Sequence, residues 1–290
     1  MGFDFNMEWN SKSRILIVGL GLMGGSYARA LKRLGYYVSA IDRNNEAIQY
    51  ALENNIIDTG STEADKTLIS EADTLIFALY PGIIKDWIRE NQDAFKTGIF
   101  ITDVTGIKSR IVYDIQDILR NDVEFIAAHP MAGREMSGIE YSDEKIFMGA
   151  NYIVVPTDRN TEEAVGWCGM LGRMLGFSRI SVLSPEEHDR MIAFVSQLTH
   201  CIAVSLMTCH DDRRLADFTG DSFRDLTRIA KINENMWTEL FFMNKDKLLY
   251  EMDAFINEFK YIRDCIDRED SEALKEKMRL STERRKNFDK

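Results

Sequence analysis

One histidine stands out by its position in the sequence. His129 follows the apolar run 123–128 and precedes Pro130, and the pattern predicts that a buried strand ends there. An unperturbed imidazole has a pKa of about 6.5, so it can accept a proton near neutral pH. A lone histidine more often has a structural role, but one at the carboxyl end of a strand can serve as a general base. Of the four histidines in the chain, His129 is therefore the one that we expect to do chemistry.

A glycine-rich loop follows the first apolar run of the chain. Gly19, Gly21 and Gly24 fit the pattern GxGxxG, and a helical pattern begins directly after them. In dinucleotide-binding folds these glycines permit a tight turn, close approach of the backbone to a pyrophosphate, and close packing of the helix on the strand. The N-terminus of the helix adds unpaired N–H groups and a partial positive charge. The loop predicts a dinucleotide site, with a purely structural turn as the alternative.

The end of the second apolar run indicates which dinucleotide would bind. Asp42 stands there, and a carboxylate at this place accepts hydrogen bonds from the ribose hydroxyls and repels a 2′-phosphate. NAD is therefore favoured over NADP, although Arg43 follows and its guanidinium could accommodate a phosphate. For Asp103, at a later strand end, capping of the next helix or a structural role in the loop is the alternative to ligand contact. The expected cofactor contacts are Gly19, Gly21, Leu22, Met23, Gly24, Asp42, Arg43, Leu79, Tyr80, Pro81 and Asp103.

These side chains must be positioned by an alternating pattern of strands and helices. Apolar runs separated by amphipathic stretches predict a mostly parallel sheet with helices on both faces, which is an α/β Rossmann-like fold. Ligands bind such sheets at the carboxyl ends of the strands, where His129 is expected. The predicted strands cover 14–20, 36–42, 72–81, 97–105, 123–130, 151–156 and 178–184.

The pattern becomes helical in the last third of the chain. Ser184 is a good helix cap, Pro185 suits the first turn, and two acidic residues follow. We therefore expect an N-terminal extension over 1–13, a dinucleotide-binding domain over 14–183 and an all-α domain over 184–290. The helices of the second domain carry more apolar residues than so small a unit can bury, which predicts a homodimer formed through this domain.

The composition limits the classes of partner and compartment. A net charge of −11 argues against a nucleic-acid-binding surface, which is usually basic. No run approaches the roughly 20 apolar residues that span a bilayer, so no membrane partner is expected. The four cysteines form no CxxC pair, so no metal site is expected. Without a disulfide pattern or a signal peptide, the sequence predicts a cytoplasmic protein.

Five segments together resemble one enzyme family. They are GLGLMGGSYARAL (19–31), DVTGIK (103–108), HPMAGRE (129–135), FVSQLTH (194–200) and RDLTRIAKINENMW (224–237). The sequence resembles the prephenate dehydrogenases of tyrosine biosynthesis, a family that includes arogenate dehydrogenases. The resemblance runs over nearly the whole chain, and the pairing of HPMAGRE with LTRIA is more specific than the glycine loop. It implies a Rossmann-like domain followed by an all-α C-terminal dimerisation domain.

The resemblance also implies a reaction and a set of site residues. The reaction is the oxidative decarboxylation of prephenate to 4-hydroxyphenylpyruvate and CO₂, with NAD as the oxidant. The histidine of the family motif, matched by His129, takes the proton of the ring hydroxyl. Substrate contacts are implied for His200, Arg228 and Trp237, and Arg224, expected on the same helix face as Arg228, could add a second cation. Glu135 is expected to pair with a cation at the entrance of the site and gate access, with a pair between Arg134 and Glu135 as the alternative. Taken alone, Arg228 would be a surface charge, and His200 and Trp237 would be core residues.

One motif departs from the family pattern, and several functions stay open. Some relatives have a serine where this chain has Gly106, so the hydroxyl's role could pass to Thr105 or be missing. Arogenate dehydrogenase, which acts on the amino analogue, is the nearest alternative. A β-hydroxyacid dehydrogenase would instead use a catalytic lysine in the helical domain. A non-catalytic dinucleotide-binding regulator would keep the glycine loop without needing His129 together with Arg228.

Overall fold

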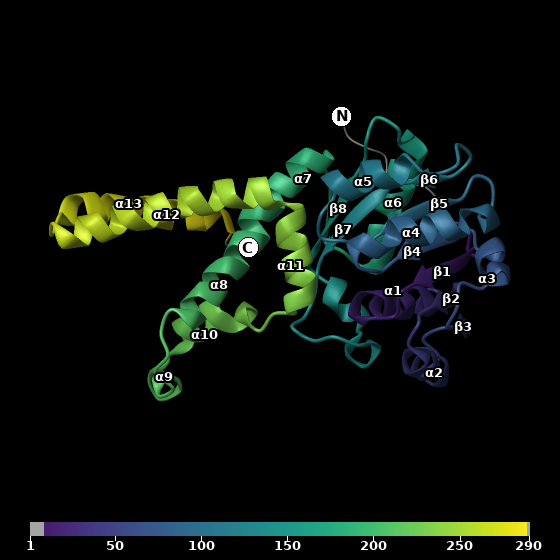
Figure 1. Ribbon diagram of the computed structural model, residues 1–290, viewed down its shortest axis with the longest axis horizontal. Helices are drawn as coiled ribbons and strands as arrows, with labels where there is room; N and C mark the ends of the chain where they lie inside the picture. The colour runs from purple at the N-terminus through teal and green to yellow at the C-terminus, as the bar shows by residue number, and fades with distance from the viewer. Residues whose placement is uncertain (1–8, 289–290) are drawn as a thin grey trace.

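The first half of the chain forms a parallel sheet of six strands. The computed structural model describes residues 9–288, so residues 1–8 of the predicted N-terminal extension and the last two residues of the chain lie outside the described part. The strand order is β3-β2-β1-β4-β5-β6, and every neighbouring pair is parallel (Figure 1). The strands are β1 (Arg14–Val18), β2 (Tyr37–Ile41), β3 (Thr59–Ser61), β4 (Thr74–Phe77), β5 (Phe100–Asp103) and β6 (Glu124–Phe125). The predicted α/β Rossmann-like sheet is confirmed, although β3 is too short and too polar to be found in the sequence.

Helices pack on both faces of this sheet. Alternate residues of β1 enter two different hydrophobic clusters, because successive side chains of a strand point to opposite faces. Ile15 and Ile17 pack with α1, α2 and α6, whereas Leu16 and Val18 pack with α3, α4 and α5. The helices are α1 (Leu22–Arg33), α2 (Asn45–Glu53), α3 (Lys66–Glu71), α4 (Pro81–Asn91), α5 (Ser109–Gln116) and α6 (Glu162–Leu175).

The predicted strand 123–130 divides between two sheets. After β6 the chain continues into β7 (Ala127–Met131), which pairs antiparallel with β8 (Asn151–Val155) in a second, three-stranded sheet with β9 (Arg179–Val182). The prediction that Pro130 ends the strand is wrong, since Pro130 lies inside β7 opposite Tyr152. A proline is tolerated there because β7 is an edge strand, so its missing N–H breaks no ladder. His129 lies just beyond the carboxyl end of β5, where the N–H of Ala128 donates to Asp103 Oδ1 at 3.2 Å.

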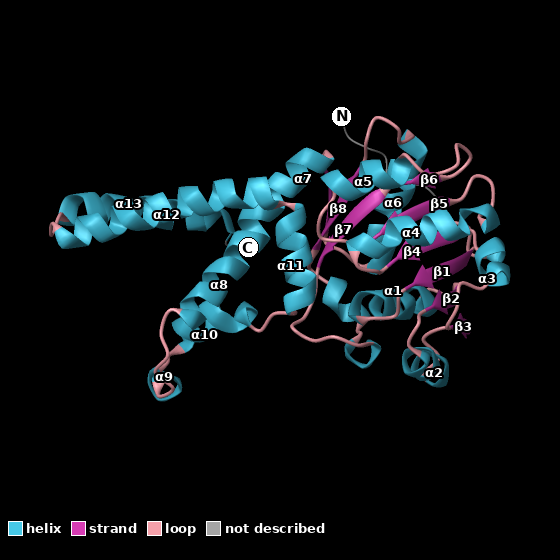
Figure 2. Ribbon diagram, in the orientation of Figure 1, coloured by secondary structure: helices cyan, strands magenta, loops and turns pink. Residues whose placement is uncertain are grey.

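The rest of the described chain is helical, as predicted. Ser184 caps the first helix with Glu187 in a capping box. The elements are α7 (Pro185–Ile192), a π-helical segment η4 (Ala193–Leu198), α8 (Thr199–Thr208), α9 (Leu215–Phe218), α10 (Asp221–Thr227), a 3₁₀ turn η5 (Arg228–Ala230), α11 (Glu234–Met243), α12 (Lys245–Asp267), α13 (Ser271–Arg285) and a last 3₁₀ turn η6 (Lys286–Phe288). Figure 2 shows that α12 and α13 form an arm that extends away from the strands, whereas α11 lies beside them.

One continuous helix is long and apolar by itself. Pro185–Thr208 has 24 residues, and an 18-residue window within it has a mean hydropathy of 1.6 with 28% of the window buried. By length and composition alone it meets the criteria for a membrane span, contrary to the sequence prediction that no run would approach them. A helix that packs against other helices of a soluble protein meets the same criteria, so this observation alone indicates no membrane.

Candidate active site

The glycine loop is shaped partly by its own packing and partly by an open space. Gly19 has a φ of +102°, and a Cβ built on Gly24 would lie 1.9 Å from the carbonyl oxygen of Gly19. Those two positions therefore need glycine for the fold itself. A Cβ on Gly21 would meet nothing within 4 Å, and no side chain caps the N-terminus of α1. The loop thus leaves room and unpaired N–H groups where the pyrophosphate of a dinucleotide would lie.

Two glycine variants should separate these roles. Gly24→Ala should lower the free energy of unfolding by about 1–3 kcal/mol and weaken NAD binding, because the added methyl overlaps the Gly19 carbonyl. Gly21→Ala should leave the melting temperature nearly unchanged and still weaken NAD binding. Thermal unfolding and titration calorimetry with NAD measure the two effects. Unchanged NAD affinity in Gly21→Ala would show that the open space beside this residue is not the cofactor site.

Asp42 lies at the end of β2, beside the glycine loop. Its Oδ2 accepts from the N–H of Leu20 at 2.6 Å, and its Oδ1 accepts from the N–H of Asn44 at 2.8 Å. These bonds hold the carboxylate at the position where a ribose would bind. Arg43 is exposed. Leu22 and Met23 form the first turn of α1 above the same loop.

The segment after β4 contacts the helical domain. Tyr80 is exposed, and its hydroxyl accepts a 3.4 Å hydrogen bond from Asn233 Nδ2. The N–H of Gly82, in the first turn of α4, donates to Glu239 Oε1 of α11 at 2.7 Å. Leu79 approaches Gly19, and Pro81 begins α4. The two domains therefore meet at the carboxyl edge of the sheet, where the ligand is expected.

Asp103 is a buried structural residue rather than an exposed ligand contact. Its Oδ2 accepts from Lys108 Nζ at 2.6 Å and from the N–H of Thr105 at 3.0 Å, and neither ionic side chain is exposed. The structure supports the loop alternative for Asp103 and not the cofactor contact. Asp103 also does not cap α5, because α5 begins only at Ser109, and no side chain from its own segment caps it.

Thr105 does not supply the hydroxyl that Gly106 lacks. Its hydroxyl donates to Asp103 and accepts from Lys108 Nζ at 3.1 Å, and the residue is buried. The predicted substrate contact of Thr105 is therefore not supported by this geometry. Gly106 itself lies beside the site, since a Cβ on it would be 3.9 Å from His129 Cε1 and 3.6 Å from Leu240 of α11.

His129 takes part in a chain of hydrogen bonds that crosses between the domains. Its Nδ1 lies 2.8 Å from Nε2 of His188 on α7. Nδ1 of His188 lies 2.7 Å from Asp189 Oδ1. Burial, and then the nearby His188 and Lys108, lower the pKa of His129 well below its ordinary value. The ring is therefore neutral at pH 7 and can accept a proton.

The rings of His200 and Trp237 are in close, tilted contact. His200 lies on α8 and Trp237 on α11, and their ring centroids are 3.7 Å apart. Nδ1 of His200 donates to the carbonyl of Ser196 at 2.9 Å, which leaves Nε2 as an acceptor. Burial lowers the pKa of His200, while the opposed charges of Glu135 and Arg228 also act on this ring. The structure thus brings these four predicted residues into one neighbourhood.

Arg228 pairs with Glu135 across the two domains. Its guanidinium donates to Glu135 Oε1, and the arginine side chain is 65% exposed. Arg224 does not join them, because α10 ends at Thr227 and Arg228 belongs to a 3₁₀ turn. Arg224 pairs instead with Asp221 and with the carbonyl of Thr219. Among the described residues Arg224 therefore contacts neither Glu135 nor Arg228, and its role as a second cation stays a prediction.

The last two residues of the HPMAGRE segment have separate partners. Arg134 and Glu135 do not pair with each other, since Arg134 NH2 donates to Asp143 Oδ2 at 2.8 Å. Glu135 is therefore the carboxylate of this segment that reaches the helical domain.

Four residues of the site were missed in the sequence. His188, Asp189 and Glu239 each join elements distant in the chain, and Lys108 pairs with the nearby Asp103. The pair His188–Asp189 stands in a segment that was interpreted only as a helix start. A histidine next to an acid in the first turns of the second domain was the available signal.

Comparison with known proteins decides the family. A family model described as the nucleotide-binding domain of prephenate dehydrogenase matches residues 27–169. A second model, described as the dimerization domain of prephenate dehydrogenase, matches residues 184–280. The chain belongs to the prephenate dehydrogenase family. Its sequence is 33% identical to prephenate dehydrogenase of Bacillus subtilis, over 91% of this chain and 72% of that protein.

Two further relatives extend over almost the whole chain. Cyclohexadienyl dehydrogenase of Zymomonas mobilis is 27% identical, over 93% of this chain and 94% of that protein. The crystal structure of prephenate dehydrogenase from Aquifex aeolicus, in complex with hydroxyphenyl propionate and NAD⁺, superposes with a TM-score of 0.88. It is 28% identical and covers 97% of this chain and all of that one. The predicted family and fold of this prephenate dehydrogenase family member are confirmed.

Proposed function

We propose that this protein catalyses the NAD-dependent oxidative decarboxylation of prephenate to 4-hydroxyphenylpyruvate, a reaction of tyrosine biosynthesis. The observation that carries the proposal is the hydrogen-bonded His129, whose pKa is lowered by burial, at the carboxyl edge of a sheet whose glycine loop leaves room for a dinucleotide. Bound NAD supplies the hydride acceptor, and the residues of the loop and Asp42 would hold it. His129 accepts the proton of the ring hydroxyl as the hydroxyl becomes a carbonyl.

The substrate's carboxylates require cationic partners, and Arg228 is placed to provide one. It already holds a carboxylate, that of Glu135, in a largely exposed pair. Such exposed pairs contribute little to stability, so a substrate carboxylate can replace Glu135 at modest cost. A guanidinium binds a carboxylate bidentately, which also fixes orientation. His200 Nε2 and the face of Trp237 would line the same side of the substrate.

The activity test is an increase in absorbance at 340 nm when prephenate and NAD are added to the protein. Steady-state kcat/KM on prephenate and on arogenate then distinguishes the two substrates, which differ only by an amino group in place of the side-chain keto group. A clear preference for arogenate would contradict the substrate proposed. Absence of activity with both, with NAD binding retained, would instead support a dinucleotide-binding regulator.

We further propose that two copies associate through the helical domain, with the chain divided at 183/184. The matched dimerization domain supports this, and so do the exposed apolar side chains of α12. Phe255, Phe259 and Ile266 follow helical spacing and form one stripe, with exposures of 38%, 64% and 61%. Exposed apolar patches of this kind mark interaction sites.

All four cysteines are free thiols, which fits the proposed cytoplasmic location.

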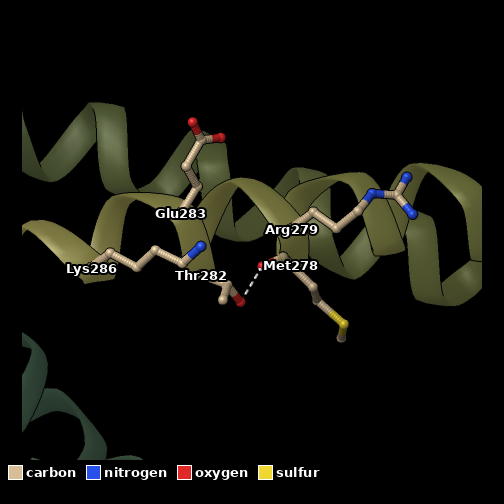
Figure 3. Close-up of a pocket in the computed structure, with 5 residues that line it drawn as sticks. All are labelled: Met278, Arg279, Thr282, Glu283 and Lys286. Atoms are coloured by element: carbon tan, nitrogen blue, oxygen red, sulfur yellow. Dashed lines mark hydrogen bonds between the residues drawn. The ribbon is translucent and has the colours of Figure 1, made fainter.

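The arm also carries a hollow that lies outside the candidate site. A hollow of about 460 Å³ on α13 is lined by Met278, Arg279, Thr282, Glu283 and Lys286 (Figure 3). It is shallow and far in the sequence from every residue of the candidate site. We therefore assign it no ligand and regard it as part of the surface available to the partner copy.

The oligomeric state can be tested with charged substitutions in the stripe. The unchanged protein should elute with about twice the chain mass of 33.4 kDa in size exclusion with light scattering. Phe259→Glu with Ile266→Glu should shift it toward the mass of one chain, because two charges would be buried in the interface. Leu34→Glu, on an exposed residue of the first domain, is the matched control and should stay dimeric. A single-chain mass for the unchanged protein would contradict the dimer.

A further inference from the structure

Two buried polar residues have no part in the reaction as described so far. His188 has no exposed surface and Asp189 only 1%, and both belong to α7 of the helical domain. Buried polar groups are costly unless they are fully hydrogen-bonded. These two form the hydrogen-bond chain that ends at His129.

We propose that His188 and Asp189 are positioning residues that hold His129 in the tautomer and orientation of a general base. This inference rests on the proposed function, in which His129 accepts the substrate proton. It adds that the helical domain, rather than the Rossmann-like domain alone, prepares the base.

The direction of the hydrogen bonds follows from Asp189. Burial by itself would raise the pKa of the Asp189 carboxyl, but hydrogen bonds from His188 and Ser109 keep it below its ordinary value. An ionised carboxylate only accepts, so Nδ1–H of His188 donates to it. Burial lowers the pKa of His188, so that ring is neutral and its Nε2 accepts from Nδ1–H of His129. Nε2 of His129 is then left without a proton, which is the state that a base requires.

Asp189 is itself fixed by the first domain. Its Oδ1 accepts from the N–H of Lys108 and its Oδ2 from the N–H of Ser109, both at 2.8 Å. It therefore caps α5 from the other domain, and a carboxylate is favoured at a helix N-terminus. Asn244 donates to the carbonyl of Asp189 at 2.8 Å and fixes the backbone as well. The hydrogen-bond chain from Asp189 through His188 to His129, called the relay below, thus depends on how α7 docks on α5.

Gly106 explains why this chain needs such a relay. With no side chain at Gly106, no hydroxyl stands beside the Cε1 edge of His129. His188 is its hydrogen-bond partner within the described residues. The charged groups that act on the two rings are Lys108, Asp103 and Asp189. Lys108 and Asp103 pair with each other at 2.6 Å, so much of their effect on the rings cancels.

A matched pair of substitutions at His188 tests the proposal. His188→Leu removes the acceptor and should lower kcat by about 10²-fold with KM for prephenate nearly unchanged. His188→Gln offers an amide oxygen near the position of Nε2 and should stay within about 10-fold of the unchanged protein. NAD affinity and the melting temperature identify variants that fail to fold. Equal losses in the two folded variants would overturn the inference.

The same substitution in the His129→Asn background separates this inference from the proposed function. If His188 acts through His129, His188→Leu should change kcat there by less than about 3-fold. A full 10²-fold further loss would mean a structural role and would overturn the relay. If His129→Asn alone is fully active, the base assignment fails. If His129→Asn is impaired but His188→Leu is not, only the relay fails.

A pH profile of Asp189→Asn gives a second readout. Loss of this negative charge leaves Lys108 less compensated, so the pKa of His129 should fall further. The acid limb of kcat/KM should then move to lower pH while the plateau drops. A drop of the plateau with an unmoved limb would contradict the electrostatic link between Asp189 and His129.

Discussion

Replacing His129 by asparagine is expected to lower kcat by about 10²–10⁴-fold, which is the usual contribution of a positioned base. KM for prephenate should stay within about 3-fold, because the side chain acts on the proton and not on a carboxylate. Asparagine fills a similar volume and can still donate to His188, so the fold should be retained. Steady-state kinetics with the variant at saturating NAD measure both constants.

The pH dependence of the unchanged protein provides the control for this assignment. Burial, His188 and Lys108 lower the pKa of His129 well below its ordinary value of about 6.5. The neutral form of His129, which acts as the base, is therefore present at every pH above the lowered pKa. We expect kcat/KM to fall only as the pH drops through this lowered pKa. A limb with a midpoint above pH 6.5 would point to another group, and a fully active His129→Asn would exclude the base role.

Replacing Arg228 by alanine is expected to raise KM for prephenate by about 10–100-fold, with a smaller change in kcat. Hydrogen bonds to charged groups contribute about 1.5–3 kcal/mol, which corresponds to this range. The loss of the exposed pair with Glu135 should cost little stability, so the melting temperature should barely change. Arg228→Lys should recover only part of the affinity, since lysine cannot bind a carboxylate bidentately.

Arg224→Ala is the matched control for this prediction. Arg224 has a similar side-chain exposure, 64%, and lies in the same segment, but it pairs with Asp221 and not with Glu135. Its removal should leave KM within about 3-fold of the unchanged protein. If the two alanine variants raise KM equally, a general loss of positive charge would explain the effect, and Arg228 would have no specific contact.

The sequence predicts what depends on local patterns and strand order. The glycine loop, Asp42 and the helix start at Ser184 all lie where their patterns place them, because each is determined by a few adjacent residues. His129 lies beyond the carboxyl end of β5, at the expected edge of the sheet, but inside an edge strand of a second sheet and not at the end of its own strand. The sheet change at Ile126 has no signal in an uninterrupted apolar run.

The contacts between the domains could not be predicted from local patterns. His188 lies 59 positions after His129, and Glu239 lies 157 positions after Gly82, so their meeting depends on how the domains dock. The partners of Arg224, Asp221 and the carbonyl of Thr219, also have no signal in a motif that places it four residues before Arg228. The sequence leaves the role of Asp103 open because its partner, Lys108, is a buried lysine. Lysines are rarely buried unless they form an ion pair, so the pattern alone does not predict this contact.

The π-helical segment Ala193–Leu198 sets the angular phase between the two halves of its helix. Side chains of an α-helix advance by about 100° per residue, so a regular helix would place His200 about 120° around the axis from His188. A π-helical turn absorbs one additional residue, which brings the two imidazoles to within about 20°. This single extra residue lets one helix present, on the same side, both the histidine that orients the base and the histidine beside Trp237.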